Sequence, residues 1–226
     1  MSSSKLVRLC GLAIVVSGVL YVITSLTDIF LDLIPEAPPA AFYLEGAIGM
    51  FAAPLEVLGL VGLYARRPQA LGTFGLIAFL VTFFGAALAA GAAWYVAFGR
   101  PSLALLNVQL LQVLEIDRPG PYAFAEALTF LLYYLGWVLF GVAVLQGRLY
   151  PRLAVILLIV VALLSGAWNV LLNLMLGPLN PGSILPYASA VINILFNGIL
   201  AWLGFALWTG RGVPEASRTT EVGRPS

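Results

Sequence analysis

The sequence contains no histidine, a single cysteine and a single lysine. Without histidine, the chain lacks the most common metal ligand and the usual general base, so His-ligated haem and Ser-His-Asp hydrolysis are excluded. A lone Cys10 excludes an internal disulfide and metal sites built from several thiolates. The only lysine, Lys5, lies at the N-terminus, which excludes a G-x-x-x-x-G-K phosphate loop. We therefore expect no cofactor and no metal.

Charge is also scarce. Only 9% of the 226 residues are charged, 62% belong to the hydrophobic set, and the mean hydropathy is +1.02. An ordinary soluble domain carries about 25% charged residues, so a soluble globular protein is excluded and an integral membrane protein is indicated. The net charge is +1 and the basic residues form no dense patch, so the sequence predicts no nucleic-acid partner.

Six apolar segments are long enough to cross a bilayer, which takes about 20 helical residues. Lipid offers no hydrogen-bond partners to the backbone, so these segments should be helices. The predicted fold is all-α, a polytopic six-transmembrane-helix bundle in a single domain over residues 1–210. The predicted spans are 6–30, 41–64, 71–98, 123–146, 151–176 and 186–208. Prolines, which suit a first helical turn, lie at or just before four starts: Pro68, Pro121, Pro151 and Pro186.

The basic residues predict the orientation, because cytoplasmic loops carry an excess of arginine and lysine. With the N-terminus inside, nine of the eleven basic residues fall on the inner side, and only Arg100 and Arg118 fall outside. Both termini should then be cytoplasmic, in the inner membrane of a bacterium. On the outer side between spans three and four, Ser102 should cap a short interfacial helix from Leu103 to Glu115. Residues 211–226 are polar and should form a disordered tail.

Small residues recur along the third span. Gly85, Ala89 and Ala93 are spaced four apart, which lets two helix backbones approach closely. Such a face is typical of packing within the bundle. It would equally suit a homodimer or the docking of another membrane protein, and the sequence does not separate these alternatives.

One acid lies in the middle of a predicted span. Glu56 follows Pro54 by two residues in span two, and Pro54 cannot donate a hydrogen bond to the carbonyl of Met50. An ionisable residue at this depth is costly and therefore suggests function. Glu56 should bind a proton or a ligand, or alternatively be a neutral acid that holds the bundle together through a hydrogen bond.

Spans five and six carry matching polar rows at four-residue steps, which keeps each row on one helix face. Because the two helices are antiparallel neighbours, residues at the same depth in the membrane should face each other: Asn173 and Ser189, Asn169 and Asn193, and Ser165 and Asn197. These rows should form an interhelical ladder or a polar wall of a cavity that faces Glu56. Buried phenols also need partners. The predicted ligand-binding residues are Glu56, Tyr133, Tyr134, Ser165, Asn169, Asn193 and Asn197.

The stretch from Tyr134 to Ala154, with its Gly-Arg-Leu-Tyr-Pro-Arg turn, resembles the junction between the fourth and fifth spans of uncharacterised six-span bacterial membrane proteins. The segment Ala201-Trp-Leu-Gly-Phe-Ala-Leu-Trp208 is similar to their last span. Tyr150, between Leu149 and Pro151, departs from the Gly-x-Leu-Pro-Arg turn of such proteins. The resemblance covers the second half of the chain. It implies the six-span topology and no activity.

Three functions remain open from the sequence. The first is a small-ligand or lipid binding or transport-type protein, whose partners would be the lipid bilayer and a small amphiphilic ligand or a proton. The second is a structural or accessory subunit of a membrane complex. The third is an intramembrane enzyme, which ranks last because no G-x-G-D or S-x-x-K motif is present and no histidine is available.

Overall fold

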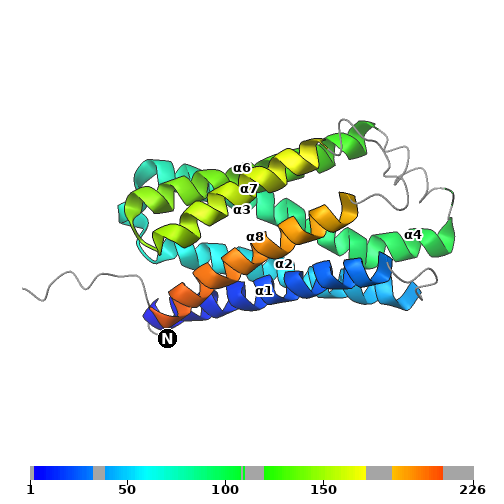
Figure 1. The fold of residues 1–226 in the computed structure, drawn as a ribbon, viewed down its shortest axis with the longest axis horizontal. Coiled ribbons are helices and arrows are strands. Elements are labelled where there is room, and N and C mark those ends of the chain that lie inside the picture. Colours follow the sequence, from blue (N-terminus) through cyan, green and yellow to red (C-terminus); the bar gives the residue numbers. More distant parts are fainter. Residues whose placement is uncertain (1–2, 33–38, 108, 110–119, 172–184, 211–226) are drawn as a thin grey trace, which may run out of the picture.

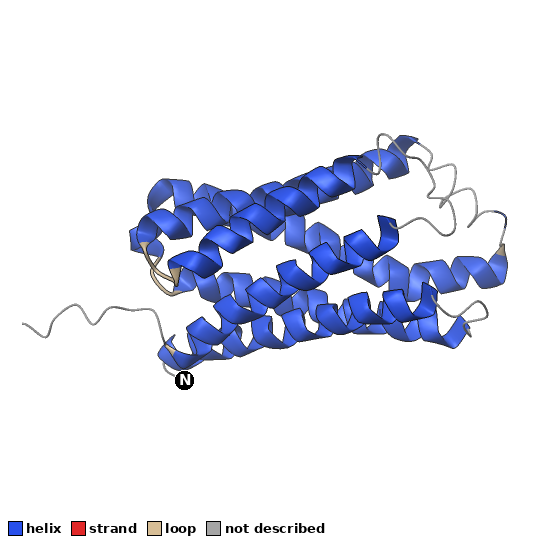
Figure 2. Cartoon of the chain, in the orientation of Figure 1, coloured by secondary structure: helices blue, strands red, loops and turns tan. Residues whose placement is uncertain are grey.

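The computed structural model describes residues 3–32, 39–107, 109, 120–171 and 185–210 (Figure 1). Within these ranges the backbone is helical apart from short turns, and no strand occurs (Figure 2). Six of the described helical segments are long and apolar enough to cross a membrane, which confirms the predicted all-α class with six helices of spanning length. The long helices are α1 (Ser3–Asp32), α2 (Pro39–Ala65), α3 (Pro68–Trp94), α6 (Gly120–Gly147), α7 (Arg152–Leu171) and α8 (Leu185–Thr209).

The four prolines lie where their chemistry favours them. Pro68 begins α3, Pro151 directly precedes α7, and Pro121 and Pro186 are the second residues of α6 and α8. At these positions the missing N–H has no intrahelical partner to lose. The predicted starts are thereby confirmed to within a few residues.

The third span is longer than predicted. After α3 the chain continues through a π-helical segment, Tyr95–Gly99, and through α4 (Arg100–Leu106) without leaving helical geometry. Ser102 therefore lies inside a helix and is not an N-cap, so the predicted start of an interfacial helix at this residue is wrong. The preceding helical turns already supply acceptors for the N–H groups that Ser102 would have capped. Most of the predicted Leu103–Glu115 helix lies outside the described residues.

The six long helices form a closed ring. Each helix packs against its neighbours along the chain, and α8 closes the ring on α1 (Figure 1). Contacts are most extensive between α1 and α8, between α1 and α2, and between α3 and α6, and α7 makes the least extensive contacts with its two neighbours. One end of the ring, here called the basic end, contains the start of α1, the α2–α3 turn, the α6–α7 turn and the end of α8.

Glycines allow the closest helix pairs to form. On α1, a Cβ at Gly11 would lie 2.7 Å from the backbone nitrogen of Trp208 in α8. On α3, a Cβ at Gly85 would collide with the backbone nitrogen of Tyr133 in α6, and one at Gly136 of α6 would lie 2.5 Å from the Cα of Thr82. The small-residue face at Gly85 thus packs within the bundle, where the absence of a side chain lets backbones touch.

The Arg66 side chain connects three parts of the basic end. The Arg66 guanidinium donates to the carbonyl of Gly210 at 3.4 Å and lies 5.1 Å from the ring centre of Tyr150. The Tyr150 hydroxyl in turn donates to the carbonyl of Leu63 at 3.3 Å. Burial raises the pKa of Tyr150 to about 12, although the nearby Arg66 lowers it, so the phenol keeps the proton that it donates. These contacts join α2, the α6–α7 turn and the end of α8.

Polar and apolar side chains are distributed in the opposite sense to a soluble protein. Large apolar side chains such as Phe51, Phe84 and Leu163 are exposed on the outside of the ring. Ser17, Glu56, Thr82, Ser165 and Asn197 are buried inside it. A continuous apolar exterior of this extent is compatible with a multi-pass membrane protein.

We expect Gly85→Ala to destabilise the protein and Gly91→Ala to leave it unchanged. The new methyl group at residue 85 would force α3 away from α6, and overpacking of this kind costs about 1–3 kcal/mol. At Gly91, on the same helix, a Cβ meets nothing within 4 Å. Thermal unfolding of the detergent-solubilised variants measures the difference. Equal melting temperatures for the two variants would contradict the close approach of α3 and α6.

Candidate functional site

Glu56 lies at the centre of the site. It is 2% exposed, and α2 continues as a helix through Pro54 to reach it. Its Oε1 accepts a hydrogen bond from the Tyr133 hydroxyl at 2.6 Å and another from the Trp137 indole N–H at 3.2 Å. Tyr133 and Trp137 are four residues apart on one face of α6. Because α3 stands between α2 and α6 in the ring, these two bonds cross its interior.

Aromatic rings surround this hydrogen-bonded group. Phe196 of α8 lies 5.9 Å from the ring of Tyr133, 5.8 Å from that of Tyr134 and 6.1 Å from that of Trp137, measured between centroids. The two tyrosine rings meet edge to face at 5.1 Å. Such tilted pairs are favourable geometries for aromatic rings and hold each ring in one orientation. Helices α2, α6 and α8 are therefore joined at the depth of Glu56.

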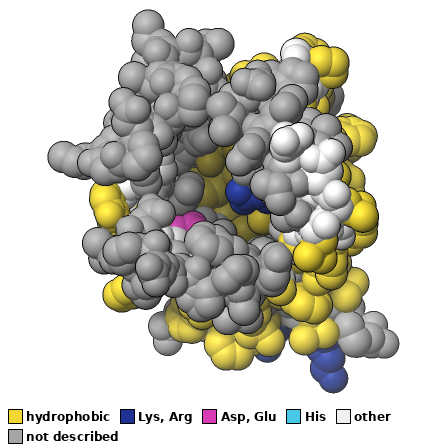
Figure 3. Space-filling model, turned by 90° about the vertical axis from the view of Figure 1, so that its right-hand side faces the viewer, with side chains coloured by type: hydrophobic (Ala, Val, Ile, Leu, Met, Phe, Trp, Pro, Cys, Tyr) yellow, Lys and Arg dark blue, Asp and Glu magenta, His cyan; other side chains and the backbone are white. Residues whose placement is uncertain are grey.

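A cavity of about 210 Å³ opens beside this group, toward the end of the ring opposite the basic end. Nine of its twelve lining residues carry a polar side-chain atom, which is unusual inside a bundle with so apolar a surface. Figure 3 looks onto this end and shows a hollow in which acidic and basic side chains are visible. The lining comes from α1, α3, α6 and α8: Tyr21, Thr24, Ser25, Asp28, Ala89, Thr129, Phe130, Tyr133, Tyr134, Asn193, Phe196 and Asn197.

Asn197 lines the cavity and also carries a buried hydrogen-bond acceptor that has no partner among the described residues. Its Nδ2 donates to the carbonyl of Asn193 at 2.9 Å, one turn earlier on α8. Its Oδ1 is buried and has no partner among the described residues, although the side chain is only 7% exposed. Buried polar atoms are nearly always paired, and an unpaired one calls for an explanation.

Four of the seven predicted ligand-binding residues line the cavity: Tyr133, Tyr134, Asn193 and Asn197. Glu56 is connected to it through Tyr133. Asn169 lies behind the wall, where its Nδ2 donates to the carbonyl of Ser165 at 2.9 Å and to the Tyr134 hydroxyl at 3.5 Å.

The predicted ladder between spans five and six is wrong at its Ser165–Asn197 rung. Neither Ser165 Oγ nor Asn197 Oδ1 has a partner among the described residues. The Nδ2 groups of Asn169 and Asn197 bond to carbonyls four residues earlier on their own helices, which an asparagine side chain reaches easily. The α7–α8 connection is instead made by Trp168, whose indole donates to Ser189 at 2.6 Å. Asn173 lies outside the described residues.

The α1 side of the cavity was missed. Tyr21, Thr24, Ser25 and Asp28 follow one another at steps of three, one and three residues, so they share one helix face. This polar face is visible in the sequence, but the prediction considered polar rows only in spans five and six. A search for polar stripes in every span, not only in the last two, would have found it.

No protein-family model, curated protein or solved structure matches the chain. The resemblance to six-span bacterial proteins therefore stays a prediction. What the residues can do chemically has to be argued from the site itself.

We expect Glu56→Leu to destabilise the protein much more than Glu56→Gln. Leucine removes the acceptor for both Tyr133 and Trp137, and a buried donor without a partner costs about 1–3 kcal/mol. Glutamine keeps an oxygen that can accept from both. Thermal unfolding in detergent compares the two variants with the wild type. If the Glu56→Leu variant has the same melting temperature as the wild type, the two hydrogen bonds to Glu56 do not stabilise the protein.

Proposed function

We propose that this chain is a multi-pass protein of the bacterial cytoplasmic membrane that binds a small amphiphilic molecule or lipid in its central cavity. The observation that carries the proposal is a cavity lined by polar side chains, one of which, Asn197, has a buried Oδ1 without a partner in the part of the chain that the structure describes. Ligand sites combine a concave surface with a few convergent polar groups. Here such groups come from α1, α6 and α8.

The orientation that we propose has both termini in the cytoplasm. Lys5, Arg8, Arg66, Arg67 and Arg148 belong to the basic end, which the positive-inside rule assigns to the cytoplasm. The cavity then opens toward the outer half of the bilayer. The higher frequency of arginine than lysine would suit a bacterium whose genome is rich in G and C.

A proton at Glu56 would be coupled to the ligand. Tyr133 is the link, because its hydroxyl donates to Glu56 while its side chain lines the cavity. A change in the protonation of the carboxyl would alter this hydrogen bond and with it the cavity wall. Transporters often place such groups near the middle of the membrane, so a transport-type function is included in the proposal.

The second candidate is an accessory subunit of a membrane complex. It is supported by the outer face of α3, where Ala87, Gly91 and Ala92 are exposed and would let a partner helix or a second copy approach. Native mass spectrometry of gently solubilised protein separates the two candidates. A stable complex with a second protein chain and no bound amphiphile would favour the subunit.

Ligand binding is tested with 1-monooleoylglycerol, which carries two hydroxyl donors. In an amine-oxide detergent, we expect Asn197→Leu to weaken its binding about tenfold, the equivalent of one lost hydrogen bond. Asn197→Asp keeps an acceptor and should lose less. Gln146→Leu, an exposed position at the basic end, serves as the control. Binding that is equal in all variants, measured by native mass spectrometry, would show that the cavity is not the site.

Orientation is tested by labelling cysteines in intact bacteria. In a Cys10→Ser background, we expect Ser102→Cys to react with a membrane-impermeant maleimide, because it is exposed at the end opposite the basic end. Gln69→Cys, exposed in the first turn of α3, should react only after the cells are permeabilised. The reverse pattern would invert the topology.

A further inference from the structure

Buried apolar side chains fill the ring between Glu56 and the basic end. Leu60 follows Glu56 by about one turn on α2, and Phe140 follows Trp137 by about one turn on α6. Both belong to one packed cluster of buried residues to which α1, α7 and α8 also contribute. Five members, each at most 1% exposed, are called the apolar layer below: Ile14, Leu60, Phe140, Leu158 and Leu200. Such a layer offers water no hydrogen-bond partner, so it blocks a proton that comes from the basic end.

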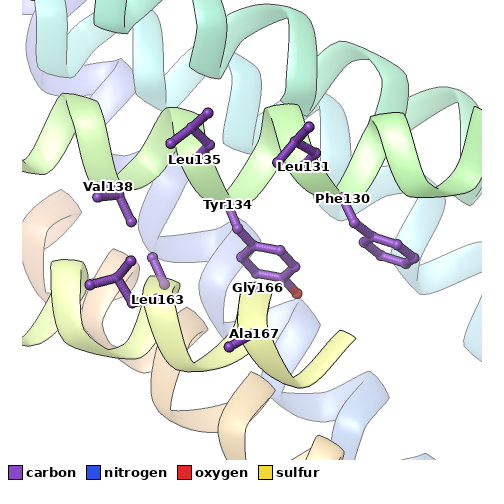
Figure 4. Close-up of a pocket in the computed structure, with 9 residues that line it drawn as sticks. Phe130, Leu131, Tyr134, Leu135, Val138, Leu163, Gly166 and Ala167 are labelled. Atoms are coloured by element: carbon purple, nitrogen blue, oxygen red, sulfur yellow. The ribbon is translucent and has the colours of Figure 1, made fainter. Parts of the chain in front are cut away.

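The side of the ring between α6 and α7 is closed by Tyr134. A depression of about 240 Å³ lies on the outer surface there, and Tyr134 stands between it and the central cavity (Figure 4). Tyr134 is 8% exposed, its hydroxyl accepts a hydrogen bond from Asn169, and a Cβ at Gly166 would lie only 3.2 Å from its Cβ. Three rings also contact it, with centroids 5.1 to 6.3 Å away: Phe130, Tyr133 and Phe196. The central cavity is therefore not continuous with the apolar depression.

Tyr133 connects the central cavity to Glu56. Its side chain lines the cavity, and its hydroxyl donates to Glu56 Oε1 at 2.6 Å. Glu56 is 2% exposed and is not among the described lining residues, so Tyr133 covers it on the cavity side. Trp137, the second donor to Oε1, is 0% exposed and lies 6.1 Å from the ring of Phe140 in the apolar layer. Glu56 thus has a polar group on its cavity side and apolar packing on its other side.

The titratable groups around Glu56 come from α1 and α6. Tyr21, Tyr133 and Tyr134 interact with it electrostatically. Farther from the basic end, Asp28 of α1 lines the cavity, Glu126 of α6 lies about two turns beyond Tyr133, and the hollow shows a basic side chain as well (Figure 3). Helices α3 and α8 carry no charged residue. Replacing Glu56 therefore removes the one carboxyl that is bonded to Trp137.

We propose that Glu56 exchanges its proton only with the side of the membrane onto which the central cavity opens, through the Tyr133 hydroxyl, so that the pH on that side regulates the cavity. The inference rests on the proposed function and adds its regulation. A proton from the cavity binds the Tyr133 oxygen while the phenol passes its own proton to Glu56 Oε1. The phenol is restored, and the carboxylate becomes a neutral carboxylic acid. This acid accepts more weakly from Tyr133, which loosens the cavity wall.

The experiment records the fluorescence of full-length protein in liposomes as the pH changes, because the Trp137 indole bonds to Glu56 and responds to its charge. We expect a pH-dependent change that is lost in Glu56→Gln and in Trp137→Phe and kept in Glu126→Gln. The absence of a change, or a change that persists in Glu56→Gln, would overturn the proton site. The binding of 1-monooleoylglycerol, measured separately, then still decides the proposed function.

A pH jump outside the liposomes tests the side of access. Liposomes with unequal numbers of the two orientations are used. In a Cys10→Ser background, labelling of Ser102→Cys by an impermeant maleimide gives the fraction whose cavity end faces outward, and Gln69→Cys gives the opposite fraction. We expect the fast part of the fluorescence change to equal the Ser102→Cys fraction, and the rest to follow only after a protonophore is added. A complete fast change, or one equal to the Gln69→Cys fraction, would overturn one-sided exchange and leave the ligand site intact.

The route through Tyr133 is tested with Tyr133→Phe, which removes the hydroxyl and keeps the bond from Trp137 to Glu56. After laser release of a caged proton on the cavity side, we expect the same final fluorescence change but a rate at least tenfold lower than in the wild type. Tyr64→Phe, which removes a phenol hydroxyl on the basic-end side of Glu56, should keep the wild-type rate. Equal rates in Tyr133→Phe and the wild type would overturn the route.

Discussion

The hydrogen bonds from Tyr133 and Trp137 to Glu56 constrain the rest of the structure. A carboxyl group in hydrocarbon without partners is far more costly than one in water, so α2 can lie at this depth only where another helix supplies donors. The donors come from α6, which is not a neighbour of α2 in the ring. The two helices must therefore face each other across the interior. Tyr133, held by Glu56, becomes a fixed part of the cavity wall.

The helix pairs of the ring differ in how closely they pack, and this difference decides where the ring contains space. Where glycines bring backbones together, as at Gly11 on α1 and Gly85 on α3, the walls are closely packed and leave no space for a ligand. The space lies elsewhere, in the interior beside Tyr133 and at the junction of α6 with α7. At that junction Gly166 faces a tyrosine ring rather than a backbone. Glycine thus brings two helix backbones together in one pair and brings a backbone close to a tyrosine side chain in another.

The candidate site could be predicted in part. Glu56, Tyr133 and Asn197 were found because polar groups are rare in spans and each needs an explanation. The ladder between Ser165 and Asn197 was wrong for a local reason: an asparagine in a helix reaches its own backbone carbonyl before it reaches a neighbour. Depth in the membrane can be read from sequence position, but the direction in which a helix face points cannot, because it depends on how the helix is rotated in the ring.

By itself, the sequence determined the six helices and their approximate ends, because hydrocarbon requires about 20 apolar residues per span and a backbone that satisfies its own hydrogen bonds. It also determined that Glu56 would need a partner. Only the tertiary structure decided that the partner is α6, that α1 supplies a cavity wall and that one acceptor of Asn197 has no partner within the described ranges. These features depend on the order and rotation of helices around the ring, and those follow from close contacts between residues far apart in the chain.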